Sequence, residues 1–179
     1  MQKKYDECKK FIDDLLRKTI FSNETYPINS SAVQGLLLAF KEEAFNKGIE
    51  VDYEIRSSLS KANCNSLDLN CIIGNMLQNA IEDIELENKY PKIILLKTYE
   101  KNHRVFIKVT NYGDVKGFEE HVDKIFNKGY TTKVNKIKTN EGLGLFTVQK
   151  IIEENNSIIY PLIEGDTISF VVSFPIGGE

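Results

Sequence analysis

The chain has 179 residues, of which 41% are hydrophobic and 27% charged, and its formal net charge is −3. This is the composition of a globular protein with one proper core. The small negative charge gives no reason to expect nucleic acid or a membrane surface as a partner, and no apolar run approaches the roughly 20 residues of a membrane span. Three cysteines without metal-ligand spacing indicate free thiols in a reducing compartment, the cytoplasm.

The first 29 residues are predicted to be an appendage to the main domain. Between Tyr5 and Phe21 apolar side chains recur at helical spacing, namely Cys8, Phe11, Ile12, Leu15 and Leu16. Residues 22–31 then contain a proline and a cluster of turn formers, which mark a boundary. We therefore expect an amphipathic helix within residues 1–29 and a single domain over residues 30–179.

The next three elements are predicted from their periodicity. A helix is expected over Ala32–Lys47, with Gly48 as its stop, and a strand with one solvated face over residues 49–56. A second helix is expected over Asp68–Asn88, with Asp68 as its cap. Its buried face consists of side chains spaced three and four residues apart: Ile72, Ile73, Met76, Leu77, Ala80, Ile81 and Ile84.

Two asparagines, Asn75 and Asn79, lie one turn apart on this second helix. At roughly 100° per residue their side chains are about 40° apart, at the border between the apolar face and solvent. Amide oxygens suit Mg²⁺, which prefers oxygen ligands, and they add no negative charge beside a polyphosphate. Two asparagines alone more often belong to an ordinary solvated polar surface.

The second half of the chain is predicted to supply most of a sheet. A hairpin is expected from residues 93–99 and 105–109, with its turn at Lys101 and Asn102. Residues 111–141 are irregular, with at most a short helix around residues 118–126, and loops of this length are usually functional or disordered. Two more strands are expected at residues 157–163 and 167–174. The elements together predict an α/β protein, a two-layer sandwich of about five strands with helices on one face.

A lysine-rich segment and a glycine pair follow one another within this half. Five lysines and no acidic residue occur between Lys124 and Lys138, and Gly142 and Gly144 come directly before a helix that extends to Asn155. Glycine lets the backbone approach a ligand, and a helix N-terminus presents unpaired N–H groups to phosphate oxygens. Each feature alone is compatible with a solvated face or with tight packing. Together they favour a phosphate cradle with a mobile cover.

Four features occur in one order: the NxxxN helix, a strand that ends in a polar turn with glycine, the segment IFNKGYTTK, and GLGL at the start of a helix. In this order they resemble the GHKL ATP-binding fold shared by sensor histidine kinases and gyrase-type ATPases. The resemblance is greatest to kinases of the peptide-pheromone and citrate-sensing type, and it extends from about residue 30 to Pro175. It implies a Bergerat-type fold with a mixed sheet, a lid around residues 112–141, and ATP and Mg²⁺ as ligands.

The resemblance also implies a role for individual residues. Asn79 is expected to coordinate Mg²⁺, and Asn75 to line the ATP phosphates. Asn111 and Gly113 fall in the box that lies under adenine. The lid is expected to include Thr131, Thr132 and Lys133, and the triphosphate cradle Gly142, Leu143, Gly144 and Leu145. Asn75 and Lys133 are the two residues expected to take part in catalysis.

The sequence departs from the family pattern at the adenine box, which reads NYGDV. The usual aspartate is Asn111, and the last glycine of the box is missing. An amide accepts a hydrogen bond from the adenine amino group but without the charge assistance that makes such bonds roughly twice as strong. We therefore expect weak or lid-dependent ATP affinity. Because Gln78 and Glu82 replace residues that are often acidic and basic in relatives, contacts to phosphate are expected to depend on Lys133.

The expected function is the ATP-binding catalytic domain of a two-component sensor histidine kinase. In the gyrase branch a glutamate at the position of Asn75 activates water, whereas an amide cannot accept that proton, which favours transfer over hydrolysis. The implied partners are a histidine-bearing dimerisation domain of a membrane-anchored parent kinase, of which residues 1–29 resemble a remnant, and a response regulator. Neither His103 nor His121 resembles the phosphoacceptor. The alternatives are a nucleotide-dead protein-interaction module and an anti-sigma-type serine kinase.

Overall fold

The computed structural model describes residues 26–28, 30–87, 91–131 and 142–177. The predicted helix of residues 5–21 lies outside the described residues. The described helices are α2 (Ser31–Asn46), α3 (Ser66–Glu87), α4 (Val115–Glu119) and α5 (Gly144–Glu154), with short 3₁₀ helices η1 (Leu59–Lys61) and η2 (Val122–Lys124). The strands are β1 (Glu50–Ile55), β2 (Ile93–Lys101), β3 (Arg104–Tyr112), β4 (Ile158–Glu164) and β5 (Thr167–Pro175).

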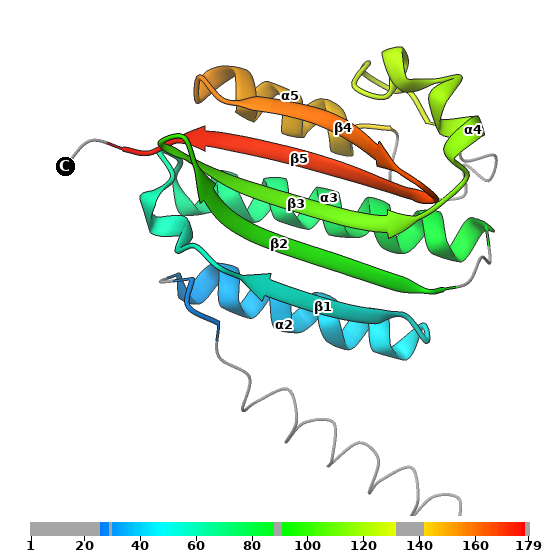
Figure 1. The fold of residues 1–179 in the computed structure, drawn as a ribbon, viewed down its shortest axis with the longest axis horizontal. Helices are drawn as coiled ribbons and strands as arrows, with labels where there is room; N and C mark the ends of the chain where they lie inside the picture. Colours follow the sequence, from blue (N-terminus) through cyan, green and yellow to red (C-terminus); the bar gives the residue numbers. More distant parts are fainter. Residues whose placement is uncertain (1–25, 29, 88–90, 132–141, 178–179) are drawn as a thin grey trace, which may run out of the picture.

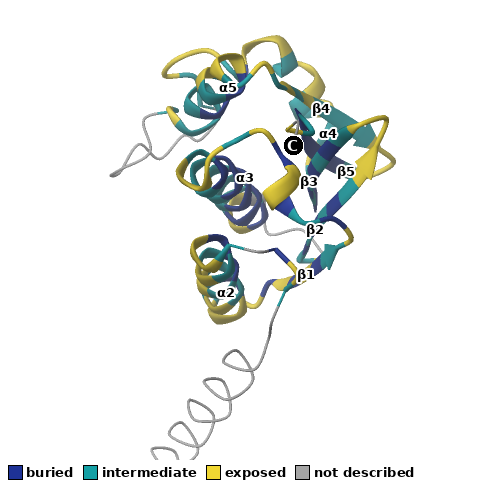
Figure 2. Ribbon diagram, turned by 90° about the vertical axis from the view of Figure 1, so that its left-hand side faces the viewer, coloured by how far each residue is buried: buried dark blue, intermediate teal, exposed yellow. Residues whose placement is uncertain are grey.

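The five strands form one mixed sheet in the order β1-β2-β3-β5-β4. Strands β1 and β2 are parallel, and the other three pairs are antiparallel. Figures 1 and 2 show that α2, α3 and α5 lie side by side on one face of this sheet. The predicted two-layer α/β sandwich with helices on one face of a mixed sheet is therefore confirmed.

Helix α3 occupies the middle of the helical layer, where it contacts α2, α5, β2 and β3. Each of the seven apolar side chains predicted for its buried face is at most 2% exposed. Burial of seven such side chains contributes roughly 1.5–3 kcal/mol apiece, so rotation of this helix about its axis is strongly opposed. The directions of Asn75 and Asn79 are fixed by the same packing.

The start of α3 differs from the prediction. The helix begins at Ser66, and Asp68 lies in its first turn rather than at its cap. Instead Asn65 provides the cap, because its Oδ1 accepts a hydrogen bond from the Asp68 backbone N–H at 2.9 Å. The Asp68 carboxylate in turn accepts a hydrogen bond from Asn65 Nδ2 at 2.8 Å. This reciprocal pair satisfies a backbone N–H that the first turn leaves without an intrahelical partner.

The connections also differ in detail from the expected ones. The hairpin turn consists of Asn102 and His103, both at positive φ, one residue later than predicted. The left-handed conformation at both positions matches the right-handed twist of the two strands, and asparagine adopts it at low cost. The predicted helix at residues 118–126 is replaced by two short helices, α4, which ends at Glu119, and η2, which begins at Val122.

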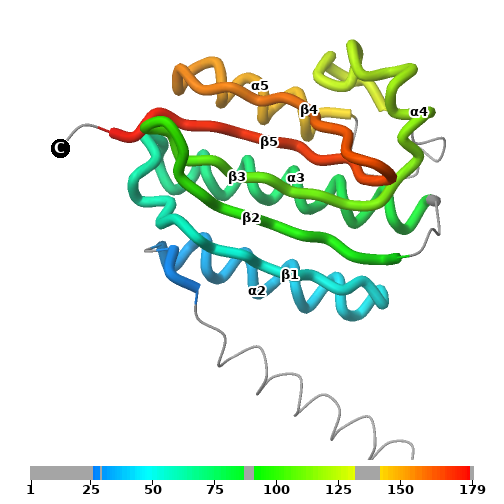
Figure 3. Tube along the Cα trace, in the orientation of Figure 1, coloured from blue at the N-terminus to red at the C-terminus, as the bar shows by residue number. Residues whose placement is uncertain are grey.

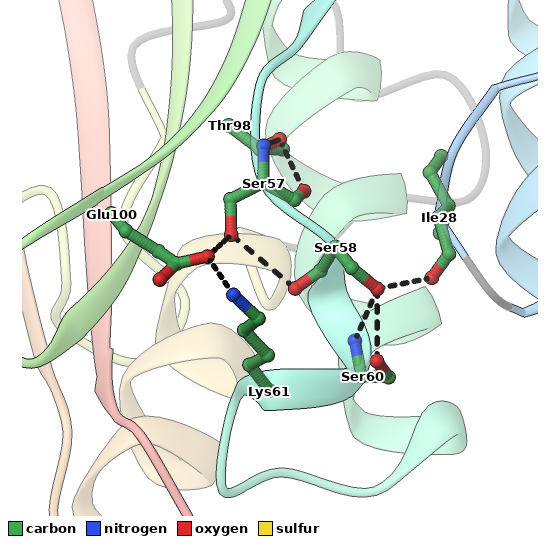
Figure 4. A network of polar contacts seen from close by, with 7 residues as sticks. All are labelled: Ile28, Ser57, Ser58, Ser60, Lys61, Thr98 and Glu100. Carbon is green, nitrogen blue, oxygen red and sulfur yellow. Dashed lines mark hydrogen bonds and ion pairs between the residues drawn. The ribbon is translucent and has the colours of Figure 1, made fainter.

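A polar network holds the connection between β1 and α3 against the sheet, as Figure 4 shows. Glu100 of β2 accepts hydrogen bonds from Ser57 Oγ and from Lys61 Nζ, both at 2.7 Å. The bond from Lys61 and then the bond from Ser57 lower the pKa of the Glu100 carboxyl. Ser58 Oγ donates a hydrogen bond to the backbone carbonyl of Ile28. Ile28 itself is only 1% exposed. The chain before α2 is therefore packed against the domain.

Replacement of Asn65 by alanine is expected to lower the free energy of unfolding by about 1 kcal/mol, because the Asp68 N–H loses its side-chain acceptor. The measurement is urea denaturation followed by circular dichroism. Asn65→Ser is the matched control, since serine keeps a capping oxygen and is expected to retain most of the stability. Equal stability of the alanine and asparagine forms would show that the cap contributes nothing.

Candidate functional site

A cavity of about 490 Å³ opens beside the second half of α3. Its walls also include the end of β3 with the following segment, the start of β5 and the start of α5. Figure 3 shows these parts converging at one end of the sheet, where β3 passes into α4. The volume is within the range of pockets that hold a small organic ligand.

Asn79 lines this cavity and is half-buried. Its Nδ2 atom is buried and has no hydrogen-bond partner within the described residues. A buried donor without a partner costs about 1–3 kcal/mol, so packing alone does not account for an amide at this position. The same side chain carries an amide oxygen, which is a ligand for a hard cation such as Mg²⁺.

Asn75 lies one turn before Asn79 on α3, and its side chain is held by contacts with Cys71. Its Nδ2 donates to the Cys71 carbonyl at 2.7 Å and contacts Cys71 Sγ at 3.4 Å. Its Oδ1 faces α5, since a Cβ built on Gly144 would lie 2.9 Å from that oxygen. Any side chain at Gly144 would displace the Asn75 amide, and glycine therefore permits the close approach of α5 to α3.

Two free thiols flank the first turns of α3. Burial, with a smaller contribution from the Asp68 carboxylate, raises the pKa of Cys64 to about 12. The same two causes raise the pKa of Cys71, and the bond from Asn75 acts in the opposite direction. Because both thiols stay protonated at neutral pH, neither is a nucleophile in this site.

Gly142 closes the loop before α5 onto the preceding segment. Its φ is +65°, and a Cβ at this position would lie 2.3 Å from the Tyr130 carbonyl oxygen. Its own carbonyl accepts a hydrogen bond from Gly129 N–H at 3.2 Å. The next helix begins at Gly144 without a side-chain cap, so its first N–H groups are available beside the cavity.

The structure brings most of the predicted site residues together. The cavity is lined by Asn75, Asn79, Gly113, Thr131, Gly142, Gly144 and Leu145. Leu143 is 38% exposed and does not line it. Asn111 is 3% exposed, does not line it either, and donates from Nδ2 to the Tyr112 carbonyl at 3.1 Å. Thr132 and Lys133 lie outside the described residues.

Several lining residues were not predicted from the sequence. The cavity also includes Asp114, Phe118, His121, Tyr130, Ile168 and Phe170. About 50 positions of sequence separate α4 and η2 from β5. The periodicity of a single element therefore cannot predict that residues from these elements line the same cavity. Asp114 and Tyr130 carried a local signal, because they lie inside the NYGDV and IFNKGYTTK segments of the family pattern.

The described wall of the cavity carries acidic side chains and one histidine, His121, but no lysine or arginine. It includes Glu82, which accepts a hydrogen bond from Gln78 Nε2 at 2.8 Å, together with Asp83 and Asp114. The lysine-rich segment is described only as far as residue 131, and neither Lys124 nor Lys128 lines the cavity. An anion bound here therefore needs positive charge from a metal ion or from beyond the described wall.

Within the described ranges, none of the helices has the length and apolar character needed to cross a bilayer. The same residues contain no cluster of three or more histidine, cysteine, aspartate or glutamate side chains that could hold a metal ion.

Known proteins resemble this chain in sequence. The family model described as the GHKL domain matches residues 64–175. A "Probable C4-dicarboxylate sensor kinase" from Halalkalibacterium halodurans is 28% identical over 129 residues, which are 70% of this chain and 23% of that protein. The chain therefore spans about a quarter of that relative's length.

Solved structures of other proteins resemble this chain in fold. The catalytic domain of histidine kinase ThkA has a TM-score of 0.68 at 22% identity, covering 84% of this chain and 93% of that one. Mycobacterial sensor histidine kinase MprB has a TM-score of 0.60 at 12% identity, covering 83% and 95%. Full-length ShkA in complex with AMPPNP has a TM-score of 0.58 at 18% identity, covering 97% of this chain and 37% of that one. At these identities the similarity establishes the fold.

Gly142→Ala is expected to destabilise the protein by about 1–3 kcal/mol more than Gly165→Ala, because only the former meets a backbone oxygen. Gly165 is the matched control, since its φ is +59° and an added Cβ would meet nothing within 4 Å. Its replacement isolates the cost of the left-handed backbone, about 1 kcal/mol. Denaturant unfolding of both variants tests this difference. Equal losses would mean that Gly142 is required by its dihedral angle alone.

Proposed function

The chain belongs to the GHKL domain family, and from this premise we propose that it is the ATP-binding catalytic domain of a sensor histidine kinase, transferring the γ-phosphoryl group of Mg-ATP to a histidine outside this chain. The observation that carries the proposal is the Asn79 side chain, which lines the cavity beside the start of α5 and has an unpartnered Nδ2. The sensor-kinase name of one relative and the AMPPNP bound to ShkA support it.

The triphosphate is proposed to lie between α3 and the start of α5. The free N–H groups at Gly144 and Leu145 suit phosphate oxygens, and the cradle extends back to Gly142. Asn79 would hold Mg²⁺ through its amide oxygen, and Mg²⁺ supplies the neutralisation of phosphate charge that phosphoryl transfer requires. A metal is consistent with the acidic wall, because anionic phosphates cannot otherwise be placed beside Glu82 and Asp83 at low cost.

The other end of the cavity suits a planar base. Phe118 and Phe170 meet edge to face, with ring centroids 6.0 Å apart, and Ile168 lies beside them on β5. Gly113 lets the backbone pass close to Ile168, since a Cβ there would lie 3.0 Å from Ile168 Cδ1. An apolar surface of this kind removes the base from water without demanding a particular substituent.

Transfer is favoured over hydrolysis by the chemistry of Asn75. Its amide cannot take a proton from water at neutral pH, and its Nδ2 is already bonded to the Cys71 carbonyl. The chain is therefore proposed to act by positioning the nucleotide and by neutralising the charge of its phosphates. Lys133, outside the described residues, stays the predicted source of positive charge from the lid.

The phosphoacceptor is proposed to come from a histidine-bearing dimerisation domain of the parent kinase, with a response regulator as the next acceptor. His103 lies in the turn between β2 and β3, at the opposite end of the sheet from α4 (Figure 1). His121 lines the cavity, and its ring lies 6.0 Å from that of Tyr130. It therefore requires an explicit control in any transfer assay.

Asn79→Ala is expected to weaken binding of a non-hydrolysable ATP analogue with Mg²⁺ at least about tenfold, because the metal loses its protein ligand. The measurement is isothermal titration calorimetry with and without Mg²⁺. The melting temperature without ligand is expected to change little, since the removed donor has no partner in the folded chain.

Asn70→Ala is the matched control for this variant. Asn70 is also an asparagine of α3 with a buried, unpartnered side-chain atom, but it does not line the cavity. Its replacement is expected to leave the affinity unchanged. Unaltered binding by Asn79→Ala, or equal losses in the two variants, would contradict the assignment. Absence of heat at millimolar nucleotide with the unmodified chain would favour the protein-interaction module.

Transfer is tested by adding γ-labelled ATP and a separately expressed histidine hairpin from the parent kinase. The label is expected on that hairpin, in an acid-labile and base-stable form, at a rate unaffected by His121→Gln. Acid-stable label on serine would indicate the serine kinase instead. Label that stays on this chain and disappears in His121→Gln would show that the acceptor lies in the cavity itself.

A further inference from the structure

We infer that Tyr26 is a positioning residue for phosphoryl transfer, because it clips the chain that enters the domain to α2 and β1. The contacts of Tyr26 with Gln34, Lys41 and Tyr53 are called the Tyr26 clip. Tyr26 does not line the cavity, so it acts on neither nucleotide nor metal. This role depends on the proposed function, since it concerns how the acceptor domain of the parent kinase is held relative to the cavity.

The backbone of the entering chain is tied to the domain at two points. At the first, Ile28 belongs to the hydrophobic core, and its carbonyl accepts a hydrogen bond from Ser58 Oγ at 3.4 Å. At the second, the Tyr26 N–H donates to Gln34 Oε1 on α2 at 3.1 Å. Between them the Ile28 N–H donates to the Tyr26 carbonyl at 2.7 Å, which closes a turn around Pro27. The chain therefore enters the domain along a fixed path.

The Tyr26 side chain adds contacts to both layers of the sandwich. Its ring meets the Tyr53 ring of β1 edge to face, with centroids 5.2 Å apart and an interplanar angle of 80°. Lys41 Nζ of α2 donates to the Tyr26 hydroxyl at 3.3 Å and lies 5.8 Å from the centre of the Tyr53 ring. Tyr53 is itself 8% exposed, and its hydroxyl donates to the Leu37 carbonyl at 2.9 Å. Because edge-to-face pairs and cations over rings are favourable, Tyr26 is held against a rigid part of the domain.

The start of the domain is already complete without the Tyr26 clip. Ile28 is 1% exposed and anchors the chain in the core, whereas Tyr26 is only half-buried. Helix α2 has its own cap, because the Ser30 side chain accepts a hydrogen bond from the Val33 N–H at 3.4 Å. The clip is therefore better explained by the course of the chain before residue 26 than by the stability of α2.

The chain enters the domain at the end of the sheet opposite to the cavity. Ile28 contacts the residues that follow β1, and the cavity lies where β3 ends; these two strand ends are opposite because β1 is parallel and β3 antiparallel to β2. Figure 1 shows the start of α2 and α4 at these two ends. Residues 22–25, between the predicted helix and the clip, span at most roughly 14 Å. Loss of the clip adds Tyr26 and Pro27 to this tether, which lowers the effective concentration of a tethered acceptor at the cavity.

The clip itself is tested by amide hydrogen exchange, measured by NMR on the full chain without nucleotide. The Tyr26 N–H is expected to exchange at least about tenfold more slowly than in an unstructured chain, because it is bonded to Gln34. Tyr26→Ala is expected to remove this protection at position 26, since the ring contacts are lost. Tyr160→Ala, which removes a partly exposed tyrosine at the other edge of the sheet, is the matched control and is expected to retain it. An unprotected Tyr26 N–H, or equal protection in Tyr26→Ala, overturns the inference.

The role in transfer is tested by comparing two formats with γ-labelled ATP. In the parent kinase, where the acceptor is tethered, Tyr26→Ala is expected to slow labelling of the histidine at least about threefold. When the histidine hairpin is supplied as a separate molecule to this chain, the rate is expected to stay within about twofold, because no tether is involved. Tyr26→Phe keeps the ring contact with Tyr53 and is expected to retain most of the tethered rate. Thermal melts establish that each variant is folded.

The comparison of the two formats separates positioning from stability. Equal slowing in both formats would mean that Tyr26 only supports the fold, and an unchanged tethered rate would mean that the clip does not position the acceptor; either result overturns the inference. Absence of transfer in both formats with the unmodified chain, while the Tyr26 N–H stays protected, overturns the proposed function and leaves the clip in place.

Discussion

The burial of one face of α3 is the constraint on which the rest of the site depends. Seven apolar side chains, each at most 2% exposed, attach this helix to the sheet and to its two helical neighbours. Rotation of α3 by even a fraction of a turn would bring polar groups into that contact, at a cost of several kcal/mol. Asn75 and Asn79 therefore point at the cavity because of residues that never touch it, and the unpartnered amide of Asn79 is maintained by packing elsewhere in the domain.

Glycine determines how closely the other walls approach α3. Gly144 lets the start of α5 come against the Asn75 amide, and Gly142 lets the loop before it close onto Tyr130. In both places a single added carbon would meet an oxygen at less than 3 Å. The N–H groups of α5 are thus held in place by two backbone contacts, one to α3 and one to the segment that follows η2. A cradle assembled in this way is available before a ligand arrives, so that little ordering is required on binding.

The described wall of the cavity does not supply the positive charge that a bound triphosphate needs. The described wall carries Glu82, Asp83 and Asp114 and no lysine or arginine. A polyphosphate beside such a wall is repelled unless a cation or a lysine lies between them. The proposed triphosphate therefore needs a cation near the asparagines, whereas the other end of the cavity is lined by the apolar rings of Phe118 and Phe170.

The sequence by itself determined the elements and the nature of the asparagine helix. Periodicity was sufficient for α2, α3 and the strands β1, β2 and β3, because each buries one face and the buried positions repeat. Strands β4 and β5 were predicted as strand-like runs on either side of a turn. The pair Asn75 and Asn79 and the glycines at positions 142 and 144 could be recognised for the same reason, since each lies at a defined point of one element. The cap of α3 was predicted three residues too late, because Asn65 and Asp68 both suit a helix start and only their mutual hydrogen bonds decide between them.

Only the tertiary structure decided which residues share the cavity. Asn111 and Asp114 are three positions apart in an irregular stretch, and no repeat indicates which of them faces inward. The structure turns Asn111 into the sheet and leaves Asp114 at the cavity rim, beside aromatic rings supplied by α4 and by β5. Such contacts join residues far apart in the chain, and they follow from strand order and helix packing. Local patterns carry no information about that packing, which is why the walls of the cavity, unlike its central helix, were decided only by the folded chain.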